Sequence, residues 1–490
     1  METLQIILFI ALFIIMALSM FLRKMPALIA LPVMAFFIPL IAGVSIDDTI
    51  QLVIGQGSLK LHNAYTVALF GSMLSILLQR TKVAESFIKK GAELSGDNPW
   101  LIAVIMMLLI TMLFTTLNGL GAIIMVATVV LPIMSSVGIG PMTVVGIFLI
   151  GLSMGGTLNA ANWAVYIDVM QLPLDVIRSF ALVMFALTFI TAIVYITLQL
   201  YRDGHDLNLR KIILTSVAIF ILIGGVGMVY VQLDPDVKTA ISQAASVLGV
   251  ALKYASATLV ALLFIMSVYR MLRRKTGSSD VHWTAYFTPV IPLFLILLFS
   301  MNFIAAFIIG LIYGFVSTYK KGSLNTLIQS ILEGGSVVMP AVVLMLGIGM
   351  LLNAIMGPGG EWAASHPEGW PVLNLLQPLM AQIIPQNALA FVLIFGLAAP
   401  LALYRGPLNV WGMGYGLAAI FMASGMNPAA VMGLLMAVGP VQGVSDPTNT
   451  HNVWLANEMQ QDVQKVLWNT LPYTWSLAVI ALIVAGVFFM

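Results

Sequence analysis

Long apolar runs follow one another along most of the chain and are separated by short polar segments. We expect about twelve of them to be membrane-spanning helices, because about 20 apolar residues in a helix cross a bilayer. The predicted spans are 4–22, 26–44, 64–79, 142–161, 180–201, 212–231, 246–269, 284–300, 302–319, 337–356, 427–447 and 471–489. The pattern therefore predicts an all-α polytopic membrane protein.

Two further apolar blocks, 100–136 and 387–424, each contain a Leu-Asn-x-x-Gly break in the middle. Each block is long enough for two short helices. Because the breaks carry few charges for a surface loop, we interpret each block as a re-entrant hairpin. The alternative is a pair of ordinary spans joined by a tight turn. Residues 80–98, 163–180 and 455–468 are predicted to be amphipathic surface helices.

The two hairpin breaks are each followed by an Asn-x-x-Asn motif. The motifs begin at Asn159 and Asn449, which lie 41 and 40 positions after Asn118 and Asn409 (159 − 118 and 449 − 409). Polar, glycine-containing breaks at matching points of two apolar halves indicate the binding site of a transporter.

This repetition divides the chain into three parts. We expect the first repeat to cover 1–201, with a helix broken near 155–162, and linker helices to cover 202–283. The second repeat is expected to cover 284–490, with a helix broken near 443–452.

The positions of Lys and Arg predict the orientation, because these residues concentrate in cytoplasmic loops. With both termini outside, 16 of the 21 basic residues fall inside, four fall at or near the outside and Arg405 falls at a hairpin tip. Spans 64–79 and 337–356 then run in opposite directions, so we predict an inverted-topology repeat. The expected location is the bacterial inner membrane.

The composition of the chain argues against several classes of protein function. The chain is 61% hydrophobic and 8% charged, whereas soluble proteins have about 25% charged residues. A net charge of +2 gives no reason to expect a nucleic-acid partner, and the absence of cysteine excludes thiol chemistry. We see no metalloprotease or nucleotide-binding motif and no paired intramembrane acids, so we expect neither an enzyme nor a resident cofactor or metal. A receptor-like sensor is disfavoured because no sizeable soluble domain is visible.

The breaks supply groups that suit a polar solute. Asn side chains both donate and accept hydrogen bonds, glycine permits tight reversals, and helix N-termini favour anions while freed carbonyls favour cations. If the asparagines are not a binding set, they are caps of broken helices. The candidate substrate-binding residues are Asn118, Gly119, Thr157, Asn159, Asn162, Arg405, Asn409, Thr448, Asn449 and Thr450.

Three residues in the second half are candidates for charge recognition and ion coupling. Arg405 can make bidentate contacts to a carboxylate; the alternatives are a snorkelling side chain or a salt bridge to Asp446. Asp446 can bind sodium or carry a proton, or it can be a helix cap. His451 can titrate near neutral pH or make a structural hydrogen bond. A sodium ion near Asn118, Asn409 and Asp446 is compatible with these residue types.

Three stretches carry a resemblance to a known group: residues 22–31 (LRKMPALIAL), the pattern from Glu333-Gly334-Gly335 to residues 347–352, and residues 449–455 (NTHNVWL). They resemble the ion transporter superfamily of citrate, gluconate and C4-dicarboxylate carriers, and most of all the gluconate:proton symporter and related permeases. The resemblance implies an elevator motion against a dimeric scaffold, with Asn449 in the substrate site. Residues 447–450 depart from the gluconate group's His-Val-Asn-Asp run, which leaves the identity of the anion open.

The sequence therefore predicts a secondary active transporter of a small organic anion. Coupling to co-transported protons or sodium is expected because no ATP site is visible. The protein is expected to be a homodimer in the lipid bilayer. The alternative is a cation:proton antiporter on the same scaffold, with Asp446 as its ion site.

Overall fold

The computed structural model describes residues 2–22, 24–94, 96–206, 235–273, 281–359, 362, 364, 366, 368–380 and 384–490. Every described element is a helix, and these ranges contain no strand. Within these ranges, eight helices are long and apolar enough to cross a membrane, or nine if one bent pair forms a single span. The prediction of an all-α polytopic membrane protein is confirmed. The predicted span 212–231 lies outside the described residues.

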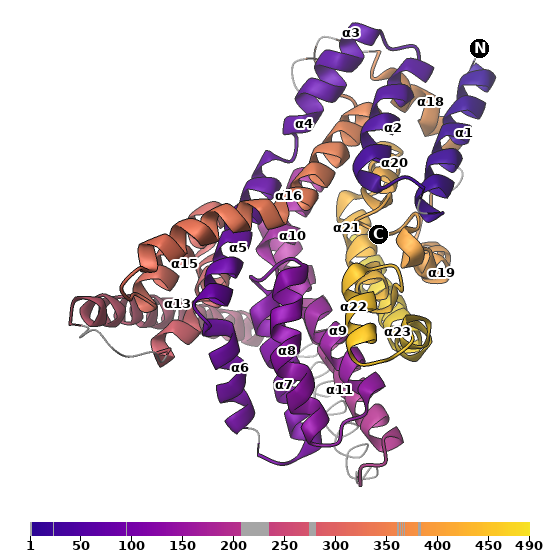
Figure 1. Ribbon diagram of the computed structural model, residues 1–490. Helices are drawn as coiled ribbons and strands as arrows, with labels where there is room; N and C mark the ends of the chain where they lie inside the picture. The colour runs from indigo at the N-terminus through magenta and orange to yellow at the C-terminus, as the bar shows by residue number, and fades with distance from the viewer. Residues whose placement is uncertain are drawn as a thin grey trace.

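The first half begins with two helices beside a long helical stretch over Ile46–Arg80, part of which is a π-helix, Thr49–Gln56. Helices α7, α8, α9 and α11 form a bundle below this stretch (Figure 1). The helices are α1 (Glu2–Phe21), α2 (Ala27–Ile41), α3 (Ile46–Asp48), α4 (Gly57–Leu59), α5 (His62–Arg80), α6 (Val83–Leu94), α7 (Pro99–Phe114), α8 (Leu120–Ser136), α9 (Pro141–Thr157), α10 (Ala160–Met170) and α11 (Leu174–Arg202).

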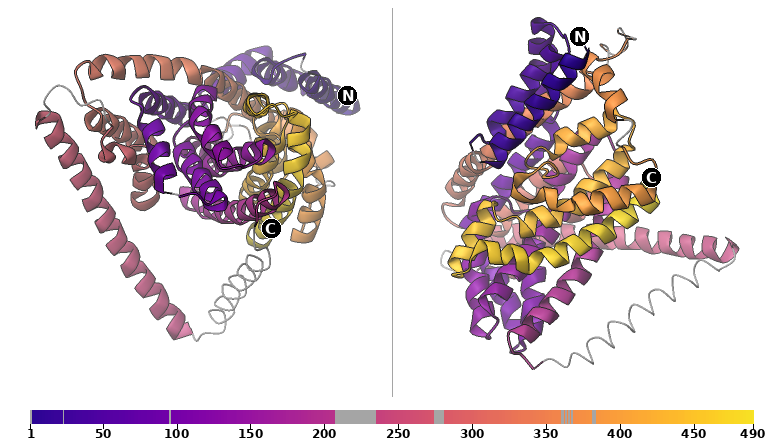
Figure 2. Two further views of the ribbon diagram at one scale, coloured as in Figure 1. Left: turned by 60° about the horizontal axis from the view of Figure 1, so that its bottom comes forward. Right: turned by 90° about the vertical axis from the view of Figure 1, so that its right-hand side faces the viewer.

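In the second half, helices α22 and α23 lie beside the first bundle, and α19 packs against α23 (Figure 1). The long helix α13 projects away from the body (Figure 2). The elements are α13 (Pro235–Arg273), η2 (Trp283–Phe287), α14 (Ile291–Phe299), α15 (Phe303–Ser317), α16 (Ser323–Met356), α18 (Pro371–Met380), α19 (Ala388–Ala398), η3 (Ala399–Arg405), α20 (Gly414–Ala423), α21 (Pro428–Pro440), η4 (Val441–Ser445), α22 (Thr450–Glu458) and α23 (Val463–Phe489).

Both apolar blocks with a central break fold as two helical segments joined by a turn. The first turn separates α7 from α8, and Gly119 adopts a φ of +86° there, a conformation that favours glycine. The second turn separates η3 from α20, and both Tyr404 and Arg405 have a φ of +55°. At Gly406 a Cβ would lie 2.2 Å from the Leu401 carbonyl oxygen, so the second tip needs glycine.

Two long helices are interrupted at the level of these turns. Helices α9 and α10 meet at a bend of 51°. Helix α21 continues into the π-helix η4, and the chain resumes as α22 only at Thr450. Non-helical backbone inside an apolar bundle is tolerated where it is buried in protein or faces a polar cavity.

Some sequence predictions need correction. Helices α2, α14 and α15 have 15, nine and 15 residues, which is short of the predicted spans. The predicted surface helix 163–180 is wrong, because Trp163 is fully buried in the half-helix α10 and its indole donates to the Thr157 carbonyl at 2.8 Å. The predicted helix 455–468 is interrupted between α22 and α23.

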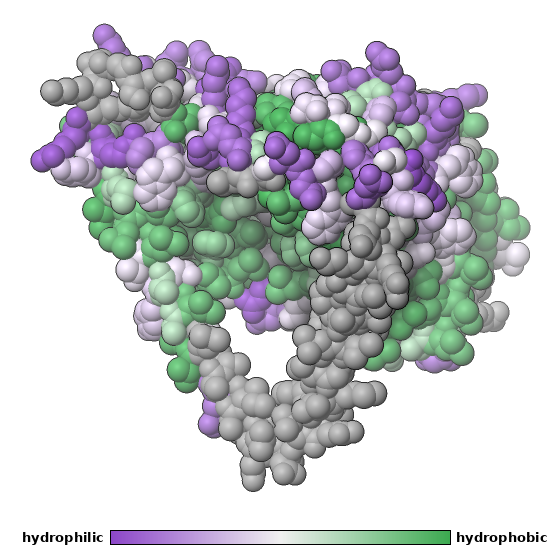
Figure 3. Space-filling view, turned by 90° about the horizontal axis from the view of Figure 1, so that it is seen from below, coloured by the Kyte–Doolittle hydropathy of each residue, from purple (hydrophilic) through white to green (hydrophobic). Residues whose placement is uncertain are grey.

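Apolar side chains cover much of the exterior, as a membrane-embedded surface requires. Seen from below, hydrophobic residues occupy a broad part of the face and hydrophilic ones gather along one side (Figure 3). The largely exposed helix α1 carries Leu4, Ile7, Ile14 and Ile15 on its surface. These positions are favourable in lipid, where exposed apolar surface does not contact water.

Helix α16 packs closely along α5 and α2 through small residues. A Cβ on Gly334 would lie 2.6 Å from the Met73 Cα of α5, so the two backbones touch as small residues allow in membrane helices. At the same crossing Arg80 Nε donates to Glu333 Oε2 at 2.8 Å. Glu333 lies inside α16.

The crossing of α5 and α16 yields a stability prediction. Gly334→Ala should lower the free energy of unfolding by about 1–3 kcal/mol, because the added methyl forces two packed backbones apart. Thermal unfolding in detergent measures the change. Gly335→Ala is the matched control, since nothing lies within 4 Å of its Cβ position. Equal melting temperatures for the two variants would contradict the close packing.

Candidate functional site

The two tips and the two helix breaks surround a cavity of about 480 Å³, which we call the polar cavity. Its walls come from both halves of the chain. Eight of the residues predicted from the sequence line it: Asn118, Gly119, Thr157, Asn162, Arg405, Asn449, Thr450 and His451. The other four, Asn159, Asn409, Asp446 and Thr448, are not among its lining residues, and the first three of these are fully buried.

Asn159 connects the first tip to the first break. Its Nδ2 donates to the Phe114 carbonyl at 3.1 Å and to Asn118 Oδ1 at 3.3 Å. Its Oδ1 accepts from the backbone N–H of Ala161 at 3.0 Å and so caps α10. One buried amide therefore fixes both the tip and the start of the half-helix.

Asp446 makes the corresponding connection in the second half. Its Oδ2 accepts from the backbone N–H of Arg405 at 3.2 Å and from Asn409 Nδ2 at 3.3 Å. Its Oδ1 accepts from the backbone N–H of Thr448 at 2.8 Å and from the Thr448 hydroxyl at 2.7 Å. Four donors thus surround a carboxylate that is inaccessible to solvent.

These contacts show which residues occupy equivalent positions in the two halves. Asn159 and Asp446 each form hydrogen bonds with three equivalent groups. The first two are the side chain of the tip asparagine and a backbone group of the residue four positions before that asparagine. The third is the backbone N–H of the residue two positions after Asn159 or Asp446 itself. Asn159 thus corresponds to Asp446 and not, as the motif alignment suggests, to Asn449. The bonding polarity also differs, because Asn159 donates to its tip whereas Asp446 accepts.

The same correspondence pairs Asn162 with Asn449, three residues further on. Asn162 Nδ2 donates to the Gly156 carbonyl at 2.8 Å, and Asn449 Nδ2 donates to the Gln442 carbonyl at 2.6 Å. Both side chains line the polar cavity. Their amide oxygens make no hydrogen bond within the described part of the chain and can accept from a bound solute.

Arg405 is a lining residue of the polar cavity. Among the described residues this side chain makes no hydrogen bond and no ion pair; only its backbone N–H is bonded, to Asp446. The alternative of a salt bridge between the two side chains is therefore not found. A cation at such a position is costly in a membrane and marks a functional site, and its five N–H donors suit an oxyanion.

Neither Asp nor Glu occurs among the described residues that line the polar cavity, and the buried carboxylate of Asp446 lies behind the tip, where it accepts from the backbone N–H of Arg405. The lining also includes the N-terminus of α22 at Thr450, where no side-chain cap is formed. A helix N-terminus carries positive partial charge and unpaired N–H groups. The described residues contain no cluster of three His, Asp or Glu residues that would hold a metal ion.

His451 lies at the same wall, and its Nε2 is 3.3 Å from the Gly443 carbonyl. The ring nitrogen must donate in this contact, since a carbonyl only accepts. The structural hydrogen bond considered for this residue is thus present.

Sequence reasoning missed several lining residues. Trp411 was overlooked although it lies inside the second Leu-Asn-x-x-Gly motif and lines the cavity. Tyr166 and Tyr415 come from different halves, and their ring centroids are 6.2 Å apart. Gln442 Oε1 accepts from the backbone N–H of Val410 at 2.8 Å and so supports the second tip. Only Trp411 had a local sequence signal.

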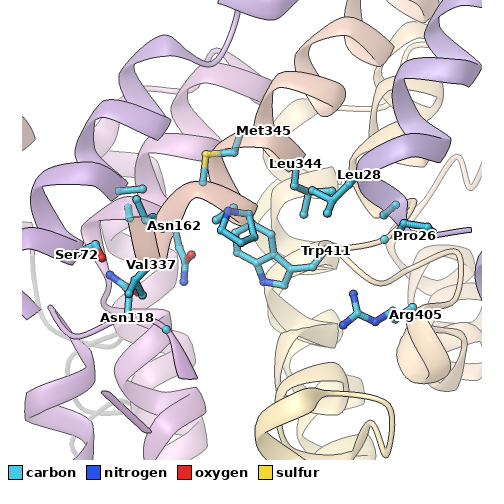
Figure 4. A pocket seen from close by; sticks show the side chains of 18 of the residues that line it. Pro26, Leu28, Ser72, Asn118, Asn162, Val337, Leu344, Met345, Arg405 and Trp411 are labelled. Atoms are coloured by element: carbon cyan, nitrogen blue, oxygen red, sulfur yellow. The ribbon is translucent and has the colours of Figure 1, made fainter. Parts of the chain in front are cut away.

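A second cavity of about 660 Å³ adjoins the first, and we call it the apolar cavity. The two cavities share Asn118, Gly119, Asn162, Arg405 and Trp411. In Figure 4, Asn118 and Asn162 lie on one side, Arg405 on the other and Trp411 between them. The tips of the two halves therefore face each other, with polar groups at the junction of two cavities.

Comparison with known proteins shows which solved structures this fold resembles. No protein-family model matches the sequence, and no curated protein matches it. The YdaH transporter of Alcanivorax borkumensis has a similar structure, with a TM-score of 0.51 at 15% identity over 90% of this chain and 88% of that chain. Neisseria gonorrhoeae MtrF, described within a class of antimetabolite efflux pumps, gives a TM-score of 0.44 at 14% identity over 90% and 85%.

The similarity to YdaH shows that this chain has the fold of a membrane transporter. The protein is an integral membrane protein with that architecture. The comparisons do not support the narrower placement in the ion transporter superfamily or beside gluconate symporters.

Proposed function

We propose that the protein is a secondary active transporter of a small organic anion. The observation that carries this proposal is the unpaired guanidinium of Arg405 in a cavity whose described lining contains no acid. The transporter fold supports the class of function. The uncapped N-terminus of α22 and the free amide oxygens of Asn162 and Asn449 supply further groups for carboxylate and hydroxyl recognition.

The location of these groups supports alternating access. The site lies between the tips of two helical units, so relative movement of the units opens it to one side or the other. In the proposed mechanism the units move as an elevator in a homodimer in the bacterial inner membrane, with inverted repeats and both termini outside. This scheme resembles carriers of the ion transporter superfamily.

Coupling to protons or sodium is part of the proposal. Asp446 is the predicted coupling residue, and its carboxylate already has four donors. An ion that binds there must displace one of them. The alternative function, a cation:proton antiporter, is favoured by the same buried acid beside the break.

An ion-gradient experiment tests the proposal. In proteoliposomes, an inward proton or sodium gradient should drive uptake of a labelled carboxylate above its equilibrium level, and an ionophore should abolish it. Uptake that stops at equilibrium under every gradient would contradict active transport. Proton or sodium flux without any organic substrate, measured by dye quenching, would instead support the antiporter.

A further inference from the structure

The apolar cavity is built from parts of the chain that the polar site does not need. Its wall includes Met20 and Leu28 from α1 and α2. Leu344 and Met345 come from α16, beyond the proline inside that helix. In Figure 4, Leu28, Leu344 and Met345 lie above Trp411. Ligand sites are mostly apolar clefts of about 300–1,000 Å³ with a few polar groups, and this cavity of about 660 Å³ has that character.

The polar groups of the apolar cavity gather at its junction with the polar cavity. Asn118, Asn162 and Arg405 line both spaces. A carboxylate bound at Arg405 therefore has an apolar space beside it as well as a polar one. The remaining lining side chains, apart from Ser72, are apolar.

Ser72 contributes a hydroxyl-bearing residue to the wall of the apolar cavity. Its hydroxyl is buried, at 1% exposure, and has no hydrogen-bond partner in the described part of the chain. Ser72 lines the apolar cavity and lies beside Asn118 in Figure 4. A buried hydroxyl without a partner is unfavourable, and a solute bonds it only when the side chain turns toward the cavity.

The charge inventory limits the ligand to one anionic group. Arg405 is the only Lys or Arg among the described residues that line either cavity. A second carboxylate would have only the partial positive charge of the α22 N-terminus as a partner, which offsets its desolvation less than a full cation does. The cavities therefore suit a monoanion better than a dicarboxylate or tricarboxylate.

We infer that the transported solute is an amphipathic monocarboxylate, whose carboxylate contacts Arg405 and whose apolar chain or ring occupies the apolar cavity. This inference rests on the proposed function and names its substrate class. It separates this protein from carriers of gluconate, C4-dicarboxylates or citrate, because those solutes are polyhydroxylated or multiply charged and leave an apolar wall without contacts.

A series of straight-chain carboxylates of increasing length tests the inference. Binding of acetate, butanoate, hexanoate and octanoate to the purified full chain in nanodiscs should tighten by roughly fourfold per methylene group until the cavity is filled. Succinate and gluconate should bind more weakly than hexanoate. Octanol should compete with hexanoate more weakly than octanoate does, since it fills the apolar cavity but lacks the carboxylate.

A cavity-filling variant supplies the structural control. Ala341 lines only the apolar cavity, so Ala341→Phe should remove the gain from chain length and leave acetate affinity unchanged. Val343→Phe, at an exposed position on the same helix, should behave as wild type. Equal affinity for acetate and octanoate in the wild type, or an unchanged series in Ala341→Phe, would overturn the inference. Failure of every carboxylate to bind would instead overturn the proposed function.

Discussion

Arg405→Ala should lower kcat/KM for carboxylate uptake by about 100-fold, because removing one partner of a desolvated charge pair costs several kcal/mol. The guanidinium has no internal partner among the described residues, so its loss should act on the solute and not on the fold. Arg405→Lys should retain part of the activity, since an ammonium keeps the charge but lacks the planar fork. Initial uptake rates in proteoliposomes over a range of substrate concentrations measure these effects.

Arg178 offers a matched control for this experiment. Its guanidinium is already bonded to Asp175 and to the Leu297 carbonyl, and it is not a lining residue of either cavity. Arg178→Ala should leave KM unchanged. Saturable uptake with wild-type parameters in Arg405→Ala would remove the assigned role of this residue.

Asp446→Asn should loosen the second tip and reduce uptake by about tenfold or more. Asp446 accepts at both oxygens, and an asparagine has only one acceptor end. In either orientation of the amide, its NH₂ group faces a backbone N–H that needs an acceptor. Each hydrogen bond lost to a buried group costs about 1–3 kcal/mol. Thermal unfolding in detergent should show the lower stability alongside the uptake defect.

The ion dependence of the remaining uptake distinguishes two roles for Asp446. If the carboxylate only positions the tip, Asp446→Asn should still concentrate substrate in response to the same gradient, with a higher KM. If it carries the coupled ion, uptake should become equilibrative. Wild-type uptake and stability together would contradict the four-bond arrangement.

Asn159→Asp is the reciprocal substitution in the first half. A carboxylate there would face the Phe114 carbonyl and Asn118 Oδ1, which are both acceptors. The expected result is a comparable loss of stability, although the new residue is the one that functions in the second half. A neutral outcome would show that the two tips tolerate either bonding polarity.

The sequence predicted the elements that local signals specify. Glycine, proline and asparagine mark turns through their own backbone preferences, and the structure has tight turns at Gly119 and Gly406. Helix breaks near Asn159 and Asp446 follow from the same signals. The lining of the polar cavity by Asn162 and Asn449 was also accessible from the motifs.

Long-range packing explains what the sequence could not supply. The pairing of Asn159 with Asp446 depends on which tip each side chain contacts, and an alignment of Asn-x-x-Asn motifs places it three residues away. The apolar cavity combines Leu28 and Leu344, which lie far apart in the chain. The burial of α10 around Trp163 depends on neighbouring helices, so its polar residues suggested a surface helix.

The positive φ and bonded backbone at Arg405 fix the one Lys or Arg among the described lining residues to one hairpin and not to the other. If the two tips separate during transport, an anion remains with the second hairpin, while the first releases only neutral amide contacts. Release of the solute then requires water to reach the Arg405 side chain. The side of the membrane on which that side chain becomes hydrated would determine where the cargo leaves.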